Sequence, residues 1–355
     1  MPIGKASTAK SQQQILRKSK KETFMTETTS GTASKRAVAG RKSRDSISPA
    51  IKTPLDLPLT SIRTVEADGV QVFYRAAGDA NAPVVLLLHG FPASSFMFRD
   101  LIPRLADRYR VIAPDLPGFG FTEIPAGRRY VYTFDALAAT INAFTQAIRI
   151  DRFALYVFDY GAPTGFRLAM ANPDRVTAIV SQNGNAYEEG LGDSWAPIRK
   201  YWAEPTAENR EVIRKNILTL EGTRWQYTHG VANPEVVPPE SYTLDTALLE
   251  RPGNKEIQLD LFLDYASNVR LYPKFQEYFR KSQPPLLAIW GKNDPFFIPA
   301  GAEAFRKDIP NANVQFLDTG HFAIETHVSD IAAAMKDFFQ ANDIASRSGG
   351  SRLAR

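Results

Sequence analysis

Short strand-like runs separated by helical stretches constrain the fold of this chain more than any other feature of its sequence. Val84–Leu88 is a continuous apolar run, as expected for a strand that is buried on both faces. Further strands are expected at Tyr109–Ala113, Phe153–Phe158, Thr177–Gln182, Leu286–Trp290 and Val314–Leu317, the last two also buried. Helices are expected at Met97–Leu105, Phe134–Ala147, Gly165–Ala171 and Ile331–Phe339. This alternation predicts an α/β fold, with a mostly parallel central sheet flanked by helices and joined by right-handed crossovers.

Two segments interrupt this alternation. Ser61–Glu66 and Val70–Arg75 alternate in polarity around Asp68-Gly69, which predicts a β-hairpin. Residues 186–280 are rich in Trp, Tyr and charged side chains, and we expect them to form several helices. We therefore expect a helical lid, residues 186–280, inserted into a single core that consists of residues 59–185 and 281–342.

The two ends of the chain differ in composition from the rest. Residues 1–50 hold eleven Lys and Arg against three acids, a charge of +8, so the other residues carry −3 of the total of +5. We expect residues 1–58 to be a disordered basic segment, because a polar, charged stretch cannot offset its ordering entropy. The polar residues 343–355 are expected to form a flexible tail. Met25 is an alternative start, which leaves the presence of residues 1–24 in the natural protein open.

Charge and hydropathy indicate what the protein binds and where it is found. The mildly acidic core gives no support for nucleic-acid binding. No run of about 18 apolar residues is present, so no membrane span is expected. Because the first residues lack the apolar region of a secretory signal, we expect a cytoplasmic protein, with organelle targeting by the basic segment as an alternative. The oligomeric state is left open.

Residue types exclude several kinds of chemistry. The chain has no cysteine, which rules out disulfides, zinc–thiolate sites and cysteine nucleophiles. Its four histidines, at positions 89, 229, 321 and 327, form no compact ligand pattern such as His-Glu-x-x-His, so no metal site is expected. We expect no cofactor, and a small organic substrate and water as the reactants.

The segment Val157-Phe158-Asp159-Tyr160-Gly161-Ala162 joins an expected strand to an expected helix. In a nucleophile elbow, the reactive residue sits on a sharp strand-to-helix turn flanked by small residues. Gly161 and Ala162 supply small side chains here, so the strand and the helix can approach closely. The residue at the turn is Asp159, whose carboxylate can attack an electrophilic carbon and form an ester. A structural role, as a helix cap or an ion-pair partner, is the alternative.

Two more polar residues follow expected strands. Asp294 lies in Gly291-Lys292-Asn293-Asp294-Pro295, and His321 lies in Thr319-Gly320-His321-Phe322. Because sites in open α/β sheets form at the carboxyl ends of strands, we expect both side chains to meet Asp159. An aspartate can orient an imidazole and stabilise its cation, and the imidazole can then act as a general base. Glu188 and Glu189 offer a less favoured position for the acid.

His89-Gly90-Phe91-Pro92 comes directly after the first buried strand. In a nucleophile-elbow architecture, the loop at this position donates a backbone N–H toward the site. The N–H groups of Phe91 and Tyr160 are therefore the expected oxyanion hole. For His89 itself we expect a structural role, with its ring satisfied by backbone groups.

Taken together, these motifs resemble the α/β-hydrolase family, in the branch of the epoxide hydrolases and haloalkane dehalogenases. The resemblance runs from about residue 62 to residue 340 and includes the loop Asp115-Leu116-Pro117-Gly118-Phe119-Gly120. It implies that Asp159 is the nucleophile, Asp294 the orienting acid and His321 the base that activates water. It thus implies a cofactor-free hydrolase with the α/β-hydrolase fold and a covalent ester intermediate on Asp159.

The leaving group separates the two activities. Dehalogenases of this branch typically have Trp after the nucleophile and Asn in the loop after the first central strand, where this chain has Tyr160 and Phe91. Fluoroacetate-type dehalogenases share Phe91-Pro92 but place Arg after the nucleophile. Epoxide hydrolases fit Phe91-Pro92 better, yet their Asn-Trp-Tyr-Arg-Asn motif is only loosely matched by Asp264-Tyr265-Ala266-Ser267-Asn268. Ala266 falls where the proton-donating Tyr of that motif stands.

Aromatic residues of the expected lid are candidate pocket residues or leaving-group donors, with packing as the alternative role for each. The candidates are Tyr187, Trp225, Tyr227 and Tyr265. The aromatic-rich lid predicts a small, mainly apolar substrate. The favoured hypothesis is hydrolysis of an epoxide to a diol. The second hypothesis is dehalogenation of a haloalkane through the same mechanism. A non-catalytic binding protein is a third hypothesis, and ester or lactone hydrolysis is a weaker fourth, because acyl transfer to a carboxylate would give an anhydride.

Overall fold

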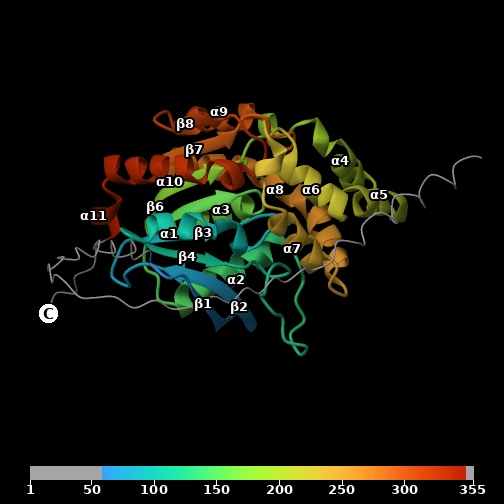
Figure 1. The fold of residues 1–355 in the computed structure, drawn as a ribbon, viewed down its shortest axis with the longest axis horizontal. Coiled ribbons are helices and arrows are strands. Elements are labelled where there is room, and N and C mark those ends of the chain that lie inside the picture. The colour runs from blue at the N-terminus through green and yellow to red at the C-terminus, as the bar shows by residue number, and fades with distance from the viewer. Residues whose placement is uncertain (1–57, 349–355) are drawn as a thin grey trace, which may run out of the picture. The chain divides into compact units, whose positions relative to one another are not determined.

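The computed structural model describes residues 58–348, so the predicted N-terminal segment lies outside it except for Pro58. An eight-stranded sheet has the strand order β1-β2-β4-β3-β5-β6-β7-β8 (Figure 1). The predicted hairpin is formed by β1 and β2, β2 also pairs antiparallel with β4, and the remaining pairs are parallel. The predicted mostly parallel α/β fold is confirmed. The strands are β1 (Ser61–Ala67), β2 (Val70–Ala77), β3 (Val84–Leu88), β4 (Arg110–Pro114), β5 (Phe153–Phe158), β6 (Val176–Gln182), β7 (Leu286–Gly291) and β8 (Asn313–Leu317).

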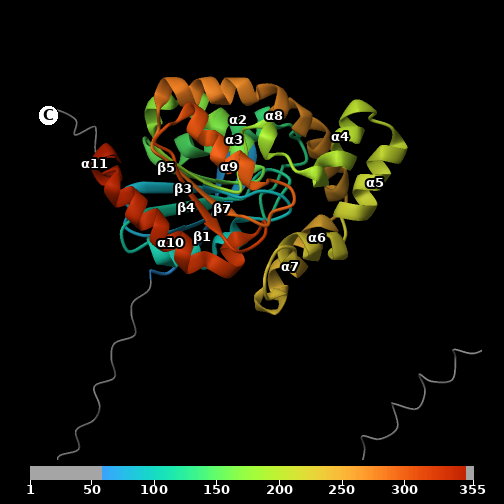
Figure 2. The same cartoon turned by 90° about the horizontal axis from the view of Figure 1, so that it is seen from above.

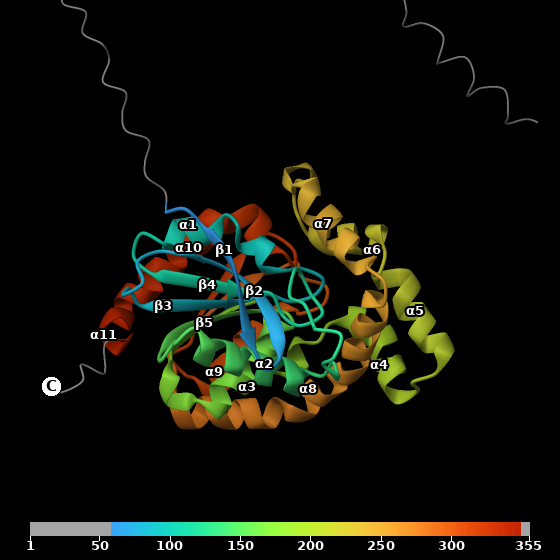
Figure 3. The same ribbon diagram turned by 90° about the horizontal axis from the view of Figure 1, so that it is seen from below.

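Each face of the sheet carries its own layer of helices, which are α1 (Leu101–Leu105), α2 (Phe134–Ala147), α3 (Gly161–Ala171), α9 (Pro299–Asp308) and α10 (Ala323–Ala341). Val85 and Leu87 of β3 belong to the apolar cluster that contains α1 and α10. Leu86 and Leu88 belong to the cluster that contains α2, α3 and α9. Figure 3 shows these two layers on opposite sides of the strands. Burial on both faces explains why β3 is an uninterrupted apolar run.

Helices also fill the long segment between β6 and β7, and we call them the inserted helices. They are α4 (Ala196–Ala203), α5 (Ala207–Ile217), α6 (Leu220–Thr228), α7 (Pro239–Leu249) and α8 (Asn254–Ser282). In Figures 2 and 3, α4 to α7 lie together at one side of the sheet, whereas α8 returns along the layer that contains α2 and α3. Across residues 58–348, no helix is both long and apolar enough to span a bilayer.

The predicted helix Met97–Leu105 is in fact two short helices. A 3₁₀-helix covers Ser95–Phe98, and α1 begins only at Leu101. Pro103 accounts for the break, because proline has no backbone N–H to donate to the carbonyl of residue 99. In the first turn of α1, that missing donor costs nothing.

The end of the chain departs further from the sequence predictions. No helix was predicted at α9, and α10 begins at Ala323 rather than at Ile331, with a kink at His327. The prediction that the last strand is buried is wrong, because β8 pairs only with β7 and its residues are half-buried or exposed. Part of the expected flexible tail is also ordered, since α11 (Ile344–Ser348) is helical and Ile344 is buried.

The junction of β5 and α3 depends on a close approach at Gly161. A Cβ atom added at Gly161 would collide with the carbonyl oxygens of Leu88 and His89 on β3 and its following loop. We therefore expect Gly161→Ala to lower the free energy of unfolding by about 1–3 kcal/mol. Gly127→Ala is the control, because a Cβ there meets nothing within 4 Å. Urea denaturation should leave this control within about 0.5 kcal/mol of the unmodified protein, and equal losses for both variants would contradict the packing argument.

Candidate active site

Asp159 lies on the sharp turn between β5 and α3. Its φ is 46°, in the left-handed region that residues other than glycine rarely adopt. The backbone N–H of Phe91 donates to Asp159 Oδ1 over 2.6 Å, and the backbone N–H of Tyr160 also hydrogen-bonds the carboxylate. Both N–H groups that were predicted to form the oxyanion hole thus contact this carboxylate.

The Asp159 carboxylate is almost completely withdrawn from solvent. Burial raises the pKa of Asp159 to about 6, while the charge of His321 and the two backbone N–H groups act in the opposite direction. At neutral pH the group is therefore mainly ionised but poorly hydrated. Oδ1 is held by Phe91, which leaves Oδ2 as the oxygen that is available to attack a bound molecule.

His321 and Asp294 form a buried hydrogen-bonded pair. Nδ1–H of His321 donates to Oδ2 of Asp294 over 2.7 Å. Asp294 is itself fixed, because its Oδ1 accepts the backbone N–H groups of Phe296 at 2.8 Å and Phe297 at 3.1 Å. With Nδ1 carrying the proton, Nε2 of His321 is unprotonated in the neutral ring and can accept a proton.

Nε2 of His321 faces the second oxygen of Asp159. The distance from Nε2 to Asp159 Oδ2 is 3.8 Å, which exceeds the length of a hydrogen bond. Burial disfavours the charged imidazole, but the adjacent Asp294, together with Asp159, raises the pKa of His321 above its ordinary value. The arrangement can therefore stabilise a cationic His321 after it takes a proton, which is what a general base requires.

Asn183 also belongs to this site, although the sequence analysis did not single it out. It follows β6 with a φ of 47°, and its Nδ2 donates to Asp294 Oδ2 over 2.7 Å. Its Oδ1 accepts the backbone N–H of Gly291 at 2.9 Å, so Asn183 ties β6 to the end of β7. Neighbouring Gln182 donates to the backbone carbonyl of His321 over 3.1 Å. Only the position of Asn183 after a strand next to β5 and β7 could have indicated this role.

A family model described as alpha/beta hydrolase fold matches residues 83–328. The chain belongs to the α/β-hydrolase family. It is 51% identical over 280 residues to an uncharacterized hydrolase of Saccharomyces cerevisiae, covering 78% of this chain and 95% of that protein. It is 38% identical over 287 residues to haloalkane dehalogenase 2 of Mycobacterium tuberculosis, covering 74% and 89%. The solved structure of the epoxide hydrolase CorEH shares the fold, with a TM-score of 0.66 and 21% identity over 80% of this chain and 99% of that one.

Two other predictions from the sequence concern His89 and the pair Glu188 and Glu189. The structural role expected for His89 is confirmed, since its Nδ1–H donates to the Gly90 carbonyl and its Nε2 accepts the N–H of Leu116 at 2.9 Å. Glu188 and Glu189 are exposed, and Glu189 pairs with Lys307. The carboxylate that contacts His321 is Asp294, so these two glutamates do not take its place.

Three of the four aromatic candidates from the inserted segment have other partners in this α/β-hydrolase. The Tyr187 hydroxyl donates to Asp308 over 2.8 Å. The Tyr227 hydroxyl donates to Asp245 over 2.5 Å. Trp225 is 41% exposed and packs its ring on His229. In this structure, neither tyrosine hydroxyl is free to donate to a leaving group at Asp159.

Tyr265 of α8 is the fourth candidate, and its ring packs against that of Tyr160, whose backbone N–H contacts the Asp159 carboxylate. The Tyr265 and Tyr160 ring centroids are 5.6 Å apart, and those of Tyr265 and Trp195 are 4.5 Å apart. Ala266, in contrast, lines a cavity that does not include Tyr265. Tyr272, two helical turns later, was missed, although its i, i+7 spacing from Tyr265 places both on one helix face. Their hydroxyl oxygens are 3.5 Å apart. Burial raises the pKa of both tyrosines, and the charge of Asp159 raises both further.

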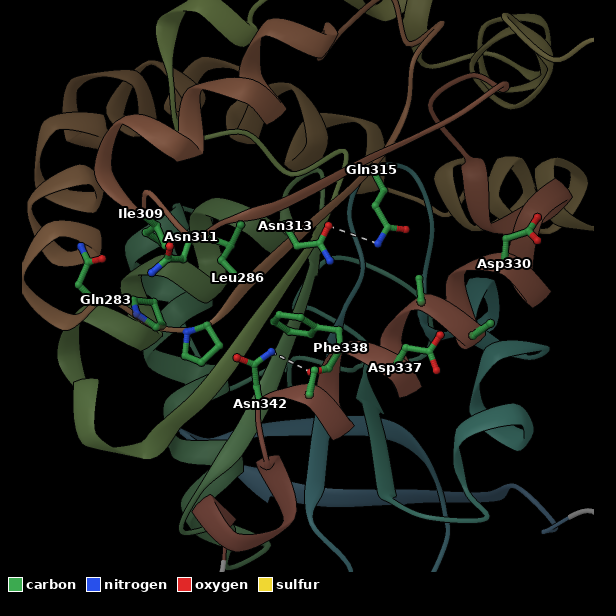
Figure 4. Close-up of a pocket in the computed structure, with 15 residues that line it drawn as sticks. Gln283, Leu286, Ile309, Asn311, Asn313, Gln315, Asp330, Asp337, Phe338 and Asn342 are labelled. Carbon is green, nitrogen blue, oxygen red and sulfur yellow. Dashed lines mark hydrogen bonds between the residues drawn. The ribbon is translucent and has the colours of Figure 1, made fainter.

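A cavity of about 740 Å³ lies elsewhere on the protein (Figure 4). It is lined by the residues that lead into β7 and β8 and by the last turns of α10, including Gln283, Asn313, Phe338 and Asn342. Asp294 and His321 follow the opposite, carboxyl ends of the same two strands, so this cavity is separate from the site. Residues 58–348 contain no group of three or more His, Asp or Glu that could hold a metal ion.

Replacing Asp294 tests the electrostatic account of His321. Asp294→Asn keeps the size of the side chain, but one of its two acceptor oxygens becomes an NH2 donor, and the charge that favours imidazolium is lost while burial remains. We therefore expect the pKa of His321 to fall, as measured by NMR titration of its ring nitrogens. His89 is an internal control, because burial lowers its pKa and its ring contacts backbone groups rather than Asp294. An unchanged His321 titration would show that Asp294 does not set its protonation.

Proposed function

We propose that this protein opens an epoxide to a diol through a covalent ester on Asp159. Asp159 is the nucleophile, and His321 is the base. Asp294 orients the His321 ring and stabilises its cationic form. The observation that carries the proposal is the chain of contacts from Asp294 to His321 at 2.7 Å and from His321 toward Asp159 Oδ2 at 3.8 Å. A protein that only bound ligands would not need a buried, poorly solvated carboxylate opposite an imidazole base.

In the first half-reaction, Oδ2 of Asp159 attacks a ring carbon of the epoxide. A bond forms between Oδ2 and that carbon while the carbon–oxygen bond of the ring breaks, so the electron pair passes to the epoxide oxygen. That oxygen takes a proton from an acidic hydroxyl as it leaves. Oδ1 becomes the carbonyl oxygen of the new ester and stays against the N–H of Phe91.

In the second half-reaction, His321 Nε2 takes a proton from water, and the hydroxide attacks Cγ of the Asp159 ester. Negative charge then develops on Oδ1, beside the backbone N–H groups of Phe91 and Tyr160. The tetrahedral intermediate collapses, the ester bond to the substrate breaks, and the departing alkoxide takes the proton from His321. The products are the diol and Asp159 as a carboxylic acid. Its proton passes through solvent to the hydroxyl that protonated the epoxide oxygen, which restores both that hydroxyl and the Asp159 carboxylate.

The available donors favour an alkoxide over a halide as leaving group. Tyr265 and Tyr272 present two hydroxyls on one face of α8, and the Tyr265 ring packs against Tyr160, the residue that follows Asp159. The indole N–H groups of the three tryptophans besides Trp225 already donate to backbone carbonyls: Trp195 to Phe296, Trp202 to Phe262 and Trp290 to Phe297. A halide would need such N–H donors, whereas an alkoxide needs a proton, which a tyrosine can supply.

Haloalkane dehalogenation is the second candidate. It is favoured by the 38% identity to haloalkane dehalogenase 2 of Mycobacterium tuberculosis over 89% of that protein. The displacement at carbon and the later hydrolysis of the ester would be the same. Only the leaving atom and its donors would differ, so one experiment can separate the two activities.

The test is to trap the ester in His321→Gln, which keeps the nucleophile but removes the base. We expect mass spectrometry to find an adduct on Asp159 after incubation with apolar epoxides, and diol formation by the unmodified enzyme. The rate of adduct formation should fall on acidification, because burial raises the pKa of Asp159 and a protonated carboxyl cannot attack.

The double variant Asp159→Asn, His321→Gln is the matched control and should form no adduct. An adduct from haloalkanes with halide release, and none from epoxides, would replace the first candidate by the second. No adduct with either class would reject carboxylate catalysis and favour a binding protein.

Removing the two hydroxyls of α8 tests the leaving-group assignment. We expect Tyr265→Phe and Tyr272→Phe each to slow epoxide turnover, and the double variant to lose about 10²- to 10⁴-fold, the range of general acid catalysis. The loss should fall on adduct formation and spare ester hydrolysis. Tyr278→Phe is the control, since Tyr278 is a buried tyrosine of the same helix. A double variant as active as this control would show that the proton comes from another group.

A further inference from the structure

Phe322, the residue after His321, is sandwiched between the core and an inserted helix. The ring of Tyr227 on α6 stacks on the ring of Phe322 with a centroid distance of 3.7 Å and an interplanar angle of 9°. On the core side, Phe322 contacts the rings of His321 at 5.1 Å and Phe158 at 5.0 Å. All four rings are buried. A displacement of Tyr227 is therefore transmitted to His321 through direct ring contacts.

Tyr227 is itself held in place. Its hydroxyl donates over 2.5 Å to Oδ2 of Asp245, a buried residue of α7. Tyr227 thus belongs to α6, its hydroxyl bonds to α7, and the face of its ring stacks on Phe322. Stacking, hydrogen bonding and burial together leave this side chain one well-defined position.

A second contact ties α7 to the segment that carries His321. Ser241 of α7 donates to Oε2 of Glu325 over 3.1 Å. Glu325 lies in the first turn of α10 and also receives both terminal nitrogens of Arg99, at 3.1 and 2.6 Å. The inserted helices α6 and α7 are thus attached on both sides of Phe322, at Tyr227 and at Ser241.

Asp159, Asp294 and His321 differ in how they are held. Asp159 is fixed by the turn and by the N–H of Phe91, and Asp294 by Asn183 and two backbone N–H groups. Within residues 58–348, the His321 ring makes one hydrogen bond, to Asp294. This one hydrogen bond leaves the His321 ring able to rotate and shift. The packing of neighbouring rings must restrict that movement.

We propose that Tyr227 is a positioning residue for His321: through Phe322 it holds Nε2 where it can take a proton from the water that hydrolyses the ester. The inference rests on the proposed function. It also means that α6, which carries Tyr227, must be docked for the second half-reaction but not for the first. Attack by Asp159 uses neither His321 nor Phe322, so loss of the stack affects the two steps unequally.

Tyr227→Leu removes the ring stack, and Tyr227→Phe removes only the bond to Asp245. We expect Tyr227→Leu to slow ester hydrolysis by about tenfold or more, since displacements near 1 Å can cost about 10²-fold. Adduct formation should stay within about twofold, so that the ester accumulates in the steady state. Tyr227→Phe should recover most of the hydrolysis rate. Rapid-quench mass spectrometry with an epoxide measures both steps in one experiment.

Tyr187 offers a matched control. It is also a buried tyrosine whose hydroxyl donates to a buried aspartate, Asp308, and whose ring packs on a phenylalanine, Phe305. We expect Tyr187→Leu to destabilise the protein comparably, yet to leave the ratio of the two rates unchanged. Equal slowing of both steps in Tyr227→Leu, or the same change of ratio in Tyr187→Leu, would overturn the proposal.

A second measurement needs no substrate. The proton between His321 and Asp294 should give a downfield NMR resonance, which we expect to shift or broaden in Tyr227→Leu but not in Tyr187→Leu. An unshifted resonance in folded Tyr227→Leu would reject the positioning role even if turnover were never found. Failure of the proposed function appears separately, as the absence of any adduct in His321→Gln.

Discussion

Asp159 holds a backbone conformation that costs roughly 1–3 kcal/mol for a residue with a side chain, and the site is built around it. The φ of 46° is imposed by β5 on one side and by α3 on the other. α3 can begin there because Gly161 lets it pack against the carbonyls at the end of β3. The same turn carries the carboxylate to the N–H of Phe91. Local strain is thus offset by packing against β3 and β5, which are central strands of the sheet.

The parallel sheet then supplies the other polar groups in order. Asp159 follows β5, Asn183 follows β6, Asp294 follows β7 and His321 follows β8, and these four strands are neighbours. Because parallel strands end at one edge, residues far apart in the chain meet without any special loop. Burial at this edge weakens hydration of Asp159, and the hydrogen bonds of Asp294 keep the His321 ring in one tautomer. Rigid backbone therefore determines the electrostatics of the site.

Local sequence signals predicted the strands that precede these residues, since β5 has the predicted bounds and β6, β7 and β8 each differ from them by one residue. The place of Asp294 and His321 after strands likewise predicted that they approach Asp159, although their catalytic roles stay predictions. Hydrogen-bond partners could not be predicted in this way. Tyr187 and Tyr227 each bond an aspartate from a distant segment, and that pairing depends on how helices pack rather than on spacing. Tyr272 was missed because no motif marks it, only its helix face.

The proposal of an alkoxide leaving group rests on side-chain contacts of this chain and not on family resemblance. To bind a halide, Trp195 or Trp290 would have to release the backbone carbonyls of Phe296 or Phe297, in the segment that also donates to Asp294. An unpaired buried carbonyl costs roughly 1–3 kcal/mol. The carbonyls left unpaired would belong to Phe296 or Phe297, whose N–H groups hold Asp294. Tyr265 and Tyr272 bear no such commitment to the backbone around Asp294, and their hydroxyls face each other at 3.5 Å. One of them can give a proton to an alkoxide while the other bonds the phenolate that remains, so an epoxide can react without disturbing the contacts of Asp294.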